Sequence, residues 1–197
     1  MARTKNEALH VTRKKQILAA ARKCFIAKGI HNASMQEICK TGKISPGALY
    51  RYYPSKQAII EAIAAEEHEQ NLELIDHLKT SKHPVKGLKE AIPNVLDTLL
   101  DKNFARLMIE ISSEATRNTQ VHNAFQQVED LFKSDLISIF KAAQSQNQIA
   151  KTINIEAAVF TLLALFDGIT ARAATDATPA KRDLSKSMGK AITALFE

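Results

Sequence analysis

The fourteen residues from Lys43 to Lys56 concentrate side chains that suit contact with a polyanion. They read KISPGALYRYYPSK and include three tyrosines, two prolines and three cationic side chains. Phenol hydroxyls, ammonium groups and guanidinium groups all donate hydrogen bonds to phosphate oxygens. Tyrosine at this density indicates either packing in a core or a surface that touches a partner, and the surrounding elements decide between the two.

The same segment carries the start and stop signals of a short helix. Ser45 suits the N-cap and Pro46 suits the first helical position. Pro54 must end the helix, because the residue before a proline avoids helical dihedrals. Leu49 and Tyr53 stand four residues apart, so they share one face, which we expect to pack against the first helix of the chain.

A second short helix is predicted immediately upstream. Ser34 and Glu37 have the spacing of a capping box, and Gly42 ends this helix about two turns later. Two short helices that are separated by about three residues form a helix-turn-helix unit. An amphipathic helix that ends at Gly29 precedes the unit, and a long helix over residues 55–78 follows it.

The start of the predicted helix at Ser45 is both narrow and positively polarised. Its first residues, Ser-Pro-Gly-Ala, have little side-chain volume, so the backbone can closely approach a grooved partner. Helix N-termini present unpaired N–H groups and the positive end of the helix dipole, which favour a phosphate. A helix that enters the major groove of DNA by its N-terminal end needs this combination.

Basic residues are concentrated in the same part of the chain. Residues 1–56 hold 12 Lys and Arg against 2 acidic residues, whereas residues 57–197 hold 15 against 19. A solvated charged face is the alternative interpretation for one basic helix. A whole segment with so few acidic residues favours a polyanionic partner.

Residues 12–60 resemble the DNA-binding segment of the TetR family of bacterial transcriptional repressors. The resemblance rests on SMQEICKTGKISPGALYRYYPSKQAII. Two differences are Gly42-Lys43, where the family often has Ala-Gly, and Tyr53, where phenylalanine is usual. The family implies an all-α homodimer of about nine helices. A helix-turn-helix DNA-binding domain would cover residues 1–56, and a helical ligand-binding and dimerisation domain would cover residues 57–197.

The resemblance also implies the DNA contacts by motif position. The start of the second helix would touch phosphate and a base edge, and the third helix would face the groove. Residues near the end of the third helix would hold phosphates or a neighbouring base, and a lysine at the turn adds a phosphate contact. The predicted DNA-binding residues are Ser34, Gln36, Lys43, Ser45, Pro46, Gly47, Ala48, Tyr50, Arg51, Tyr52 and Lys56.

The second domain is expected to bind an unidentified small molecule. One face of a predicted helix and aromatic residues of later helices can enclose an apolar cavity, the usual form of a small-molecule site. Each of these residues equally suits an ordinary core, and Asp167 equally suits a dimer contact. The predicted ligand-binding residues are Phe104, Met108, Ile111, Phe125, Phe132, Phe166 and Asp167, with Arg106 and Glu110 as further polar candidates.

Two C-terminal helices are expected to form the dimer. The helix from Asn154 to about Thr175 mixes small residues with large apolar ones, and the final helix adds a second apolar stripe. Closing the monomer core is the alternative role of these stripes. The residues concerned are Ala157, Ala158, Ala164, Ala173, Leu184, Met188, Ile192 and Leu195.

Several other classes of protein have no support in the sequence. No metal-binding or phosphate-binding motif marks an enzyme, no cofactor is implied, and Cys24 and Cys39 suit two reduced core residues. The histidines on predicted helices, His68 among them, are interpreted as exposed or hydrogen-bonded. The most apolar run, residues 157–166, is about half the length of a membrane span. We therefore expect a cytoplasmic protein without a membrane partner.

These observations predict a sequence-specific DNA-binding transcriptional regulator. It would be a homodimeric repressor that binds a double-stranded operator with inverted-repeat symmetry and is released by a small molecule. The alternative is a non-specific or architectural DNA-binding protein whose helical body binds a protein partner. A specific regulator exceeds its own affinity for random DNA by about 10³-fold or more, so competition with random DNA separates the two.

Overall fold

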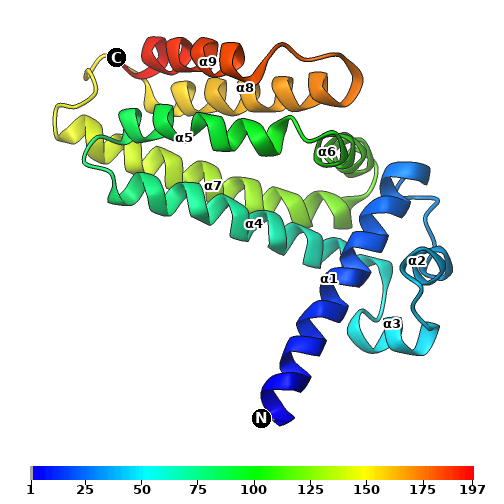
Figure 1. Ribbon diagram of the computed structural model, residues 1–197. Helices are drawn as coiled ribbons and strands as arrows, with labels where there is room; N and C mark the ends of the chain where they lie inside the picture. Colours follow the sequence, from blue (N-terminus) through cyan, green and yellow to red (C-terminus); the bar gives the residue numbers. More distant parts are fainter. Residues whose placement is uncertain (1) are drawn as a thin grey trace. The chain divides into compact units, whose positions relative to one another are not determined.

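The protein is described by a computed structural model that covers residues 2–197, with side chains from Leu9 onward. This part of the chain forms nine α-helices and no strand, which confirms the all-α prediction (Figure 1). The basic residues counted before Leu9 lie outside the described side chains. The helices are α1 (Ala2–Lys28), α2 (Met35–Gly42), α3 (Pro46–Tyr52), α4 (Lys56–Thr80), α5 (Pro84–Leu99), α6 (Lys102–Ala115), α7 (Thr119–Ser145), α8 (Ile155–Thr175) and α9 (Lys181–Phe196).

The chain packs as two compact units. The N-terminal unit comprises Met1–Glu66 and Ile109–Phe125, and the C-terminal unit comprises Glu67–Met108 and Gln126–Glu197. The N-terminal unit therefore holds more than the predicted DNA-binding domain, residues 1–56. It also includes the first part of α4 and the α6–α7 turn region, which pack around the core of α1.

The N-terminal unit has its own hydrophobic core. α1 packs on α2, and α2 packs on α3. Ile17 and Phe25 of α1, Ile38 of α2 and Leu49 of α3 are fully buried, as the predicted apolar stripes require. Helices this short are marginal in isolation, so burial of one apolar face holds α2 and α3 in helical form.

The predicted capping signals of both short helices are present. The Ser34 hydroxyl accepts from the Glu37 N–H, and the Glu37 carboxylate accepts from the Ser34 N–H, which completes a capping box. The Ser45 hydroxyl accepts from the Ala48 N–H at 3.3 Å. Each cap satisfies a backbone donor that the first helical turn leaves unpaired.

The turn between α2 and α3 depends on two adjacent residues with different roles. Lys43 adopts the left-handed conformation, with φ 50° and ψ 47°, which glycine usually occupies after a helix. Gly42 is still helical, and a Cβ there would lie 2.8 Å from Ile44 Cδ1 and 3.0 Å from Ala20 Cβ. The glycine thus permits close packing of the turn on α1, while the lysine takes the strained dihedrals.

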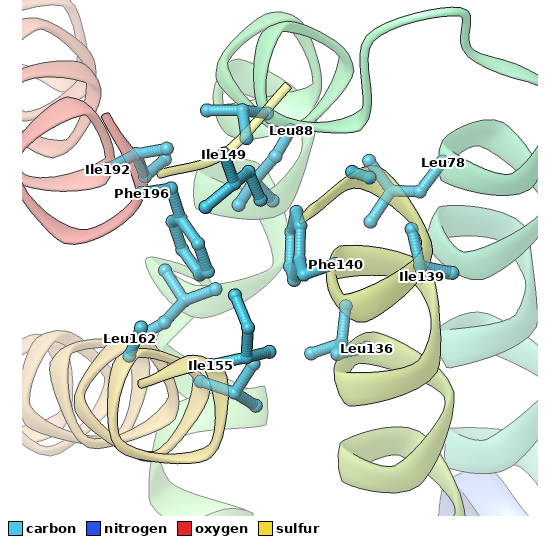
Figure 2. Packing of buried hydrophobic residues seen from close by; sticks show 14 of the residues in the cluster. Leu78, Leu88, Leu136, Ile139, Phe140, Ile149, Ile155, Leu162, Ile192 and Phe196 are labelled. Carbon is cyan, nitrogen blue, oxygen red and sulfur yellow. The ribbon is translucent and has the colours of Figure 1, made fainter. Parts of the chain in front are cut away.

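The C-terminal unit is a larger helical bundle. Figure 1 shows α8 and α9 side by side, and both pack on α5. The Phe140 and Phe196 rings meet at the centre of the core with centroids 4.3 Å apart, surrounded by aliphatic side chains such as Leu88 and Leu162 (Figure 2). Ring pairs of this geometry add to the stabilisation from buried area.

α8 corrects one argument made from the sequence. The ten-residue run that was judged too short for a membrane span belongs to a helix of 21 residues, within which an 18-residue stretch has a mean hydropathy of 1.5. By length and composition alone, α8 could cross a membrane, and only a third of its most apolar stretch is buried. The apolar run extends because Ala, Gly and Thr continue the helix beyond the large aliphatic residues.

Lys43→Gly should stabilise the protein, because glycine adopts left-handed dihedrals without the Cβ penalty. Allowing for the greater freedom of glycine in the unfolded chain, we expect a gain of about 0.5–1 kcal/mol in the free energy of unfolding. Urea unfolding measures it. The matched control is Gly42→Ala, which should destabilise by about 1–3 kcal/mol through overpacking. A destabilised Lys43→Gly variant would contradict this account of the turn.

Candidate nucleic-acid interface

The outer surface of α3 is open at its N-terminal end. Ser45, Pro46 and Gly47 are exposed, and a Cβ placed on Gly47 would meet no atom within 4 Å. Tyr50 is 50% exposed, although tyrosine usually covers much of its ring. Ala48, one of the predicted DNA-binding residues, is half-buried and therefore less open to a partner than Gly47. The most exposed surface of α3 is therefore centred on Gly47 and Tyr50.

The three tyrosines of the segment divide between surface and core. Leu49 and Tyr53 are buried, as predicted, and burial together with the charge of Glu66 raises the pKa of the Tyr53 phenol. The Tyr52 ring lies 4.6 Å from the His10 ring and has the Arg51 guanidinium 5.5 Å from its centroid. These contacts fix the Tyr52 and Arg51 side chains at the C-terminal end of α3, where both can reach a DNA backbone.

The hydroxyls of the two capping serines differ in what they can offer to a phosphate. The Ser34 hydroxyl donates its proton to Glu37 Oε2 at 3.1 Å, so it has none left for a phosphate oxygen. The Ser45 hydroxyl accepts a hydrogen bond but makes no donation within the described residues. Gln36 is exposed on the first turn of α2. Of the predicted polar contacts at these two helix starts, Ser45 and Gln36 remain available as donors.

Lys56 was predicted to hold a phosphate, and its contacts oppose that role. Its ammonium donates to the carbonyl oxygens of Ile30 at 2.6 Å, His31 at 2.9 Å and Ala33 at 3.0 Å. An ammonium group has three donors, so all of them are used within the protein. Lys56 therefore fixes the loop between α1 and α2, and the sequence motif did not reveal this because the loop lies more than 20 residues away.

The remaining cations of the N-terminal unit fall into two groups. Arg22 forms an ion pair with Glu66 at 2.7 Å, and Lys28 forms one with Glu37. Lys28, followed by the Ser34 donors, lowers the pKa of the Glu37 carboxyl to about 2. The second group consists of exposed cations that form no ion pair with an acidic side chain within the described part of the chain, and these can attract a polyanion. They are Lys14, Lys15, Lys23, Lys40, Lys43 and Arg51.

Three positioning residues were not found from the sequence. The Gln16 amide donates to the Gly42 carbonyl at 2.7 Å and so ties α1 to the turn before α3. The His10 ring contacts the Tyr52 ring at a tilt of 45°, and Glu110 of α6 accepts from the Ile30 N–H at 2.8 Å. A polar residue on the inner edge of a helix is a weak signal, because the same pattern suits a solvated side chain.

The predicted ligand-binding residues are distributed between the two units. Ile111 and Phe125 belong to the N-terminal unit, where they line an apolar gap that is too narrow for a water molecule. Phe166 is part of the core of the C-terminal unit, and Phe132 packs against that core. Phe104 and Met108 are half-buried residues of the C-terminal unit. Their role in a ligand site remains a prediction.

The polar candidates for that site are corrected in part. Glu110 is committed to the Ile30 N–H, and Arg106 is exposed. Asp167 is also exposed, on the outer face of α8, and the neighbouring groups that partly bury its carboxyl raise its pKa. His68 was interpreted from the sequence as exposed or hydrogen-bonded. Its side chain is half-buried, and its Nδ1 is buried without a hydrogen-bond partner. His68 thus replaces them as a candidate polar contact.

Nothing in the described residues marks a metal or redox site. No group of three or more His, Cys, Asp and Glu side chains within them could hold a metal ion. Cys24 and Cys39 are buried free thiols, and Cys24 Sγ lies 3.2 Å from Thr41 Oγ1. The chemistry of this surface is that of hydrogen-bond donors and cations around a short helix.

This arrangement matches known regulators along most of the chain. Residues 17–63 match the family model described as bacterial regulatory proteins, tetR family. Residues 84–196 match the model of the BetI-type transcriptional repressor, C-terminal. The chain belongs to the TetR family. The TetR-family resemblance of the sequence is thereby confirmed, and it now extends to the C-terminal helices.

Individual relatives agree with this assignment. The chain is 32% identical to the HTH-type transcriptional regulator UidR of Escherichia coli K12 over 156 residues, which are 79% of each protein. The solved structure of Salmonella enterica GusR has a TM-score of 0.78 at 31% identity and covers 93% of this chain and 95% of that one. FadR of Bacillus subtilis in complex with stearoyl-CoA shares the fold, with a TM-score of 0.78 at 18% identity over 93% and 99%.

The protein is thus a sequence-specific DNA-binding transcriptional regulator. Its TetR-family relatives are regulators and not enzymes, and a non-specific architectural role is not favoured. Members of the TetR family bind DNA operators and dimerise. The sequence predicted this function because the helix-turn-helix signals are local, whereas the positions of the DNA-contact residues on the operator remain predictions.

Gly47→Glu should abolish operator binding without damaging the fold. The carboxylate would face the phosphates, whereas an acidic side chain in the first turn of α3 suits the helix dipole and has open space. We expect operator affinity to fall at least about 100-fold in a gel-shift assay, with an unchanged or higher free energy of unfolding. Gly47→Ala, the uncharged control, should lose less than about tenfold. Normal operator binding by Gly47→Glu would mean that another face of α3 meets the DNA.

Proposed function

We propose that this regulator is a cytoplasmic homodimeric repressor and that the outer face of α8 is the centre of its dimer interface. The observation that supports the interface is an exposed stripe along α8, with Phe160 68% exposed at one end. Residues at intervals of three and four share this face. The stripe consists of Ala157, Phe160, Thr161, Ala164, Asp167, Gly168, Ala171 and Thr175.

Two glycines support close approach of another helix. Gly168 of α8 and Gly189 of α9 lie in helix interiors, and a Cβ at either position would meet no atom within 4 Å. Each costs roughly 1 kcal/mol of helix stability relative to alanine. No contact within the described part of the monomer requires glycine at either position. A second copy that packs closely on α8 and α9 would explain both glycines, because a side chain there would block its approach.

The composition of the stripe favours protein over lipid as its cover. Asp167 lies in the middle of the stripe, among alanine, glycine and threonine. Ionisable side chains are costly at a lipid-facing position, and lipid does not select for small residues. A helix pair related by a two-fold axis accommodates the small residues and Asp167 alike. The small residues allow close contact, and Asp167 can meet a hydrogen-bond donor of the second copy.

The interface differs from the one expected from the sequence. Ala158, Ala173, Met188 and Ile192 are buried within the monomer, so the alternative role in the core applies to them. Ala157 and Ala164 are exposed and stay in the proposal. Leu184 and Leu195 of α9 are half-buried beside the core. The alternation of buried and exposed small residues follows from the helical period, which places residues 157 and 158 about 100° apart.

Phe160→Glu should convert the dimer to a monomer, because a carboxylate would be buried in the contact. Sedimentation at micromolar concentration should show one subunit instead of two, and operator affinity should fall by at least tenfold because a two-fold dimer binds an inverted repeat. The matched control is Leu131→Glu, at a leucine on α7 that is 54% exposed. A native chain that sediments as a monomer, or a footprint over a single half-site, would rule out the proposed dimer.

We also propose that a small molecule releases the operator by binding the C-terminal unit. Phe104, Met108, Phe132 and Phe166 offer apolar contacts there, and the His68 Nδ1 offers an unpaired polar atom. A buried polar atom without a partner is rare and suits an incoming hydrogen-bond group. That the Bacillus subtilis FadR structure of the same fold is a complex with stearoyl-CoA is consistent with a ligand-binding unit.

Apolar and cationic metabolites should be screened by thermal shift, and each hit should then be titrated against the protein–operator complex. A coupling free energy of ~1–3 kcal/mol would weaken operator binding roughly 5- to 150-fold, with the reciprocal effect on ligand affinity. His68→Ala should reduce the thermal shift, whereas His122→Ala, at an exposed histidine of α7, should not. Ligands that stabilise the protein and never change operator affinity would refute the coupling.

A further inference from the structure

The loop between α1 and α2, residues 29–33, is held by a carboxylate from a distant helix. Ile30, in this loop, is almost fully buried. Glu110 Oε1 accepts the Ile30 N–H at 2.8 Å across 80 residues of sequence. Without that acceptor the N–H would be buried and unpaired, which native proteins avoid.

The loop is adapted to this contact. Gly29 has φ +83°, and a Cβ at Gly29 would lie 2.9 Å from Glu110 Oε1. Glycine therefore serves two needs at once, because it permits the left-handed dihedral and leaves room for the carboxylate. The carbonyl oxygens of the same loop are bound by Lys56. The Glu110 carboxylate therefore binds an N–H group of the loop, while the Lys56 ammonium binds its carbonyl oxygens.

The position of this loop determines the position of the DNA-binding helices. The loop ends at Ser34, the N-cap of α2, and α2 leads through the turn at Lys43 into α3. A shift of the loop would move the start of α2 relative to α1 and would carry α3 with it. Recognition of base edges needs α3 in register with the groove, whereas contacts to phosphates tolerate displacement.

We propose that Glu110 is a positioning residue for operator recognition, which acts through the Ile30 N–H to hold α2 and α3 in register with the major groove. The proposal extends the DNA-binding function to a half-buried residue of α6, outside the helix-turn-helix unit. It does not depend on the dimer interface on α8 or on any small molecule.

The test compares Glu110→Ala with Glu110→Gln in the full-length protein. Glutamine keeps a side-chain oxygen that can accept the Ile30 N–H, whereas alanine removes it. Gel-shift titrations against the operator and against random DNA, at a temperature where each variant is folded, give the ratio of specific to non-specific affinity. We expect alanine to lower operator affinity about tenfold or more with less than a twofold change on random DNA. Glutamine should stay within about threefold of the native protein.

Ser113→Ala, at an exposed serine one turn further along α6, is the control and should change neither affinity. If Glu110→Ala does not fold, Glu110→Asp replaces it, because its shorter side chain withdraws the carboxylate from Ile30 and should lower the specificity ratio in the same way. A contact that only stabilises the fold would lower the melting temperature and leave the specificity ratio unchanged. That result would overturn the proposal, and so would a glutamine variant as weak on the operator as the alanine variant.

Discussion

The hydrogen bonds from the Lys56 ammonium to the carbonyls of Ile30, His31 and Ala33 are the contacts on which the DNA-binding surface depends. These carbonyls lie between two helices, where no helical N–H can reach them. Bonds from a charged donor are stronger than neutral ones, and here three of them converge on one loop. Because α2 begins immediately after the loop at Ser34, the start of α4 determines where α2 begins.

From that fixed start, each later element of the surface is held by contacts with α1. The Gln16 amide holds the turn at Gly42, and the close packing of Gly42 on Ala20 leaves Lys43 to take the left-handed conformation. α3 has only seven residues and is stable only because Leu49 is buried and Ser45 caps its first turn. Its exposed side is therefore free to carry small residues and Tyr50, which the core does not need.

In the C-terminal unit, by contrast, the exposed face of interest is not needed to hold the fold together. Its core is closed by large apolar residues such as Phe140 and Phe196, so the fold does not need the outer face of α8. That face keeps an exposed phenylalanine and an unneeded glycine, both of which lower the stability or solubility of an isolated monomer. Features that cost stability in one copy are best explained by what a second copy gains from them.

Within the described residues, the two short helices, several caps and the DNA-binding function could be predicted from the sequence, because those signals act within about four residues, whereas the total of about nine helices came from the family resemblance. Ser34 with Glu37, Ser45 with Pro46, and Asn154 at the start of α8 are examples. The tertiary structure decided the rest. It directed Lys56 to a loop instead of a phosphate, brought Glu110 to Ile30, and buried Ala158 while it exposed Ala157. Such outcomes depend on which distant helix packs against each residue, and the spacing of residues within one helix does not predict which helix that is.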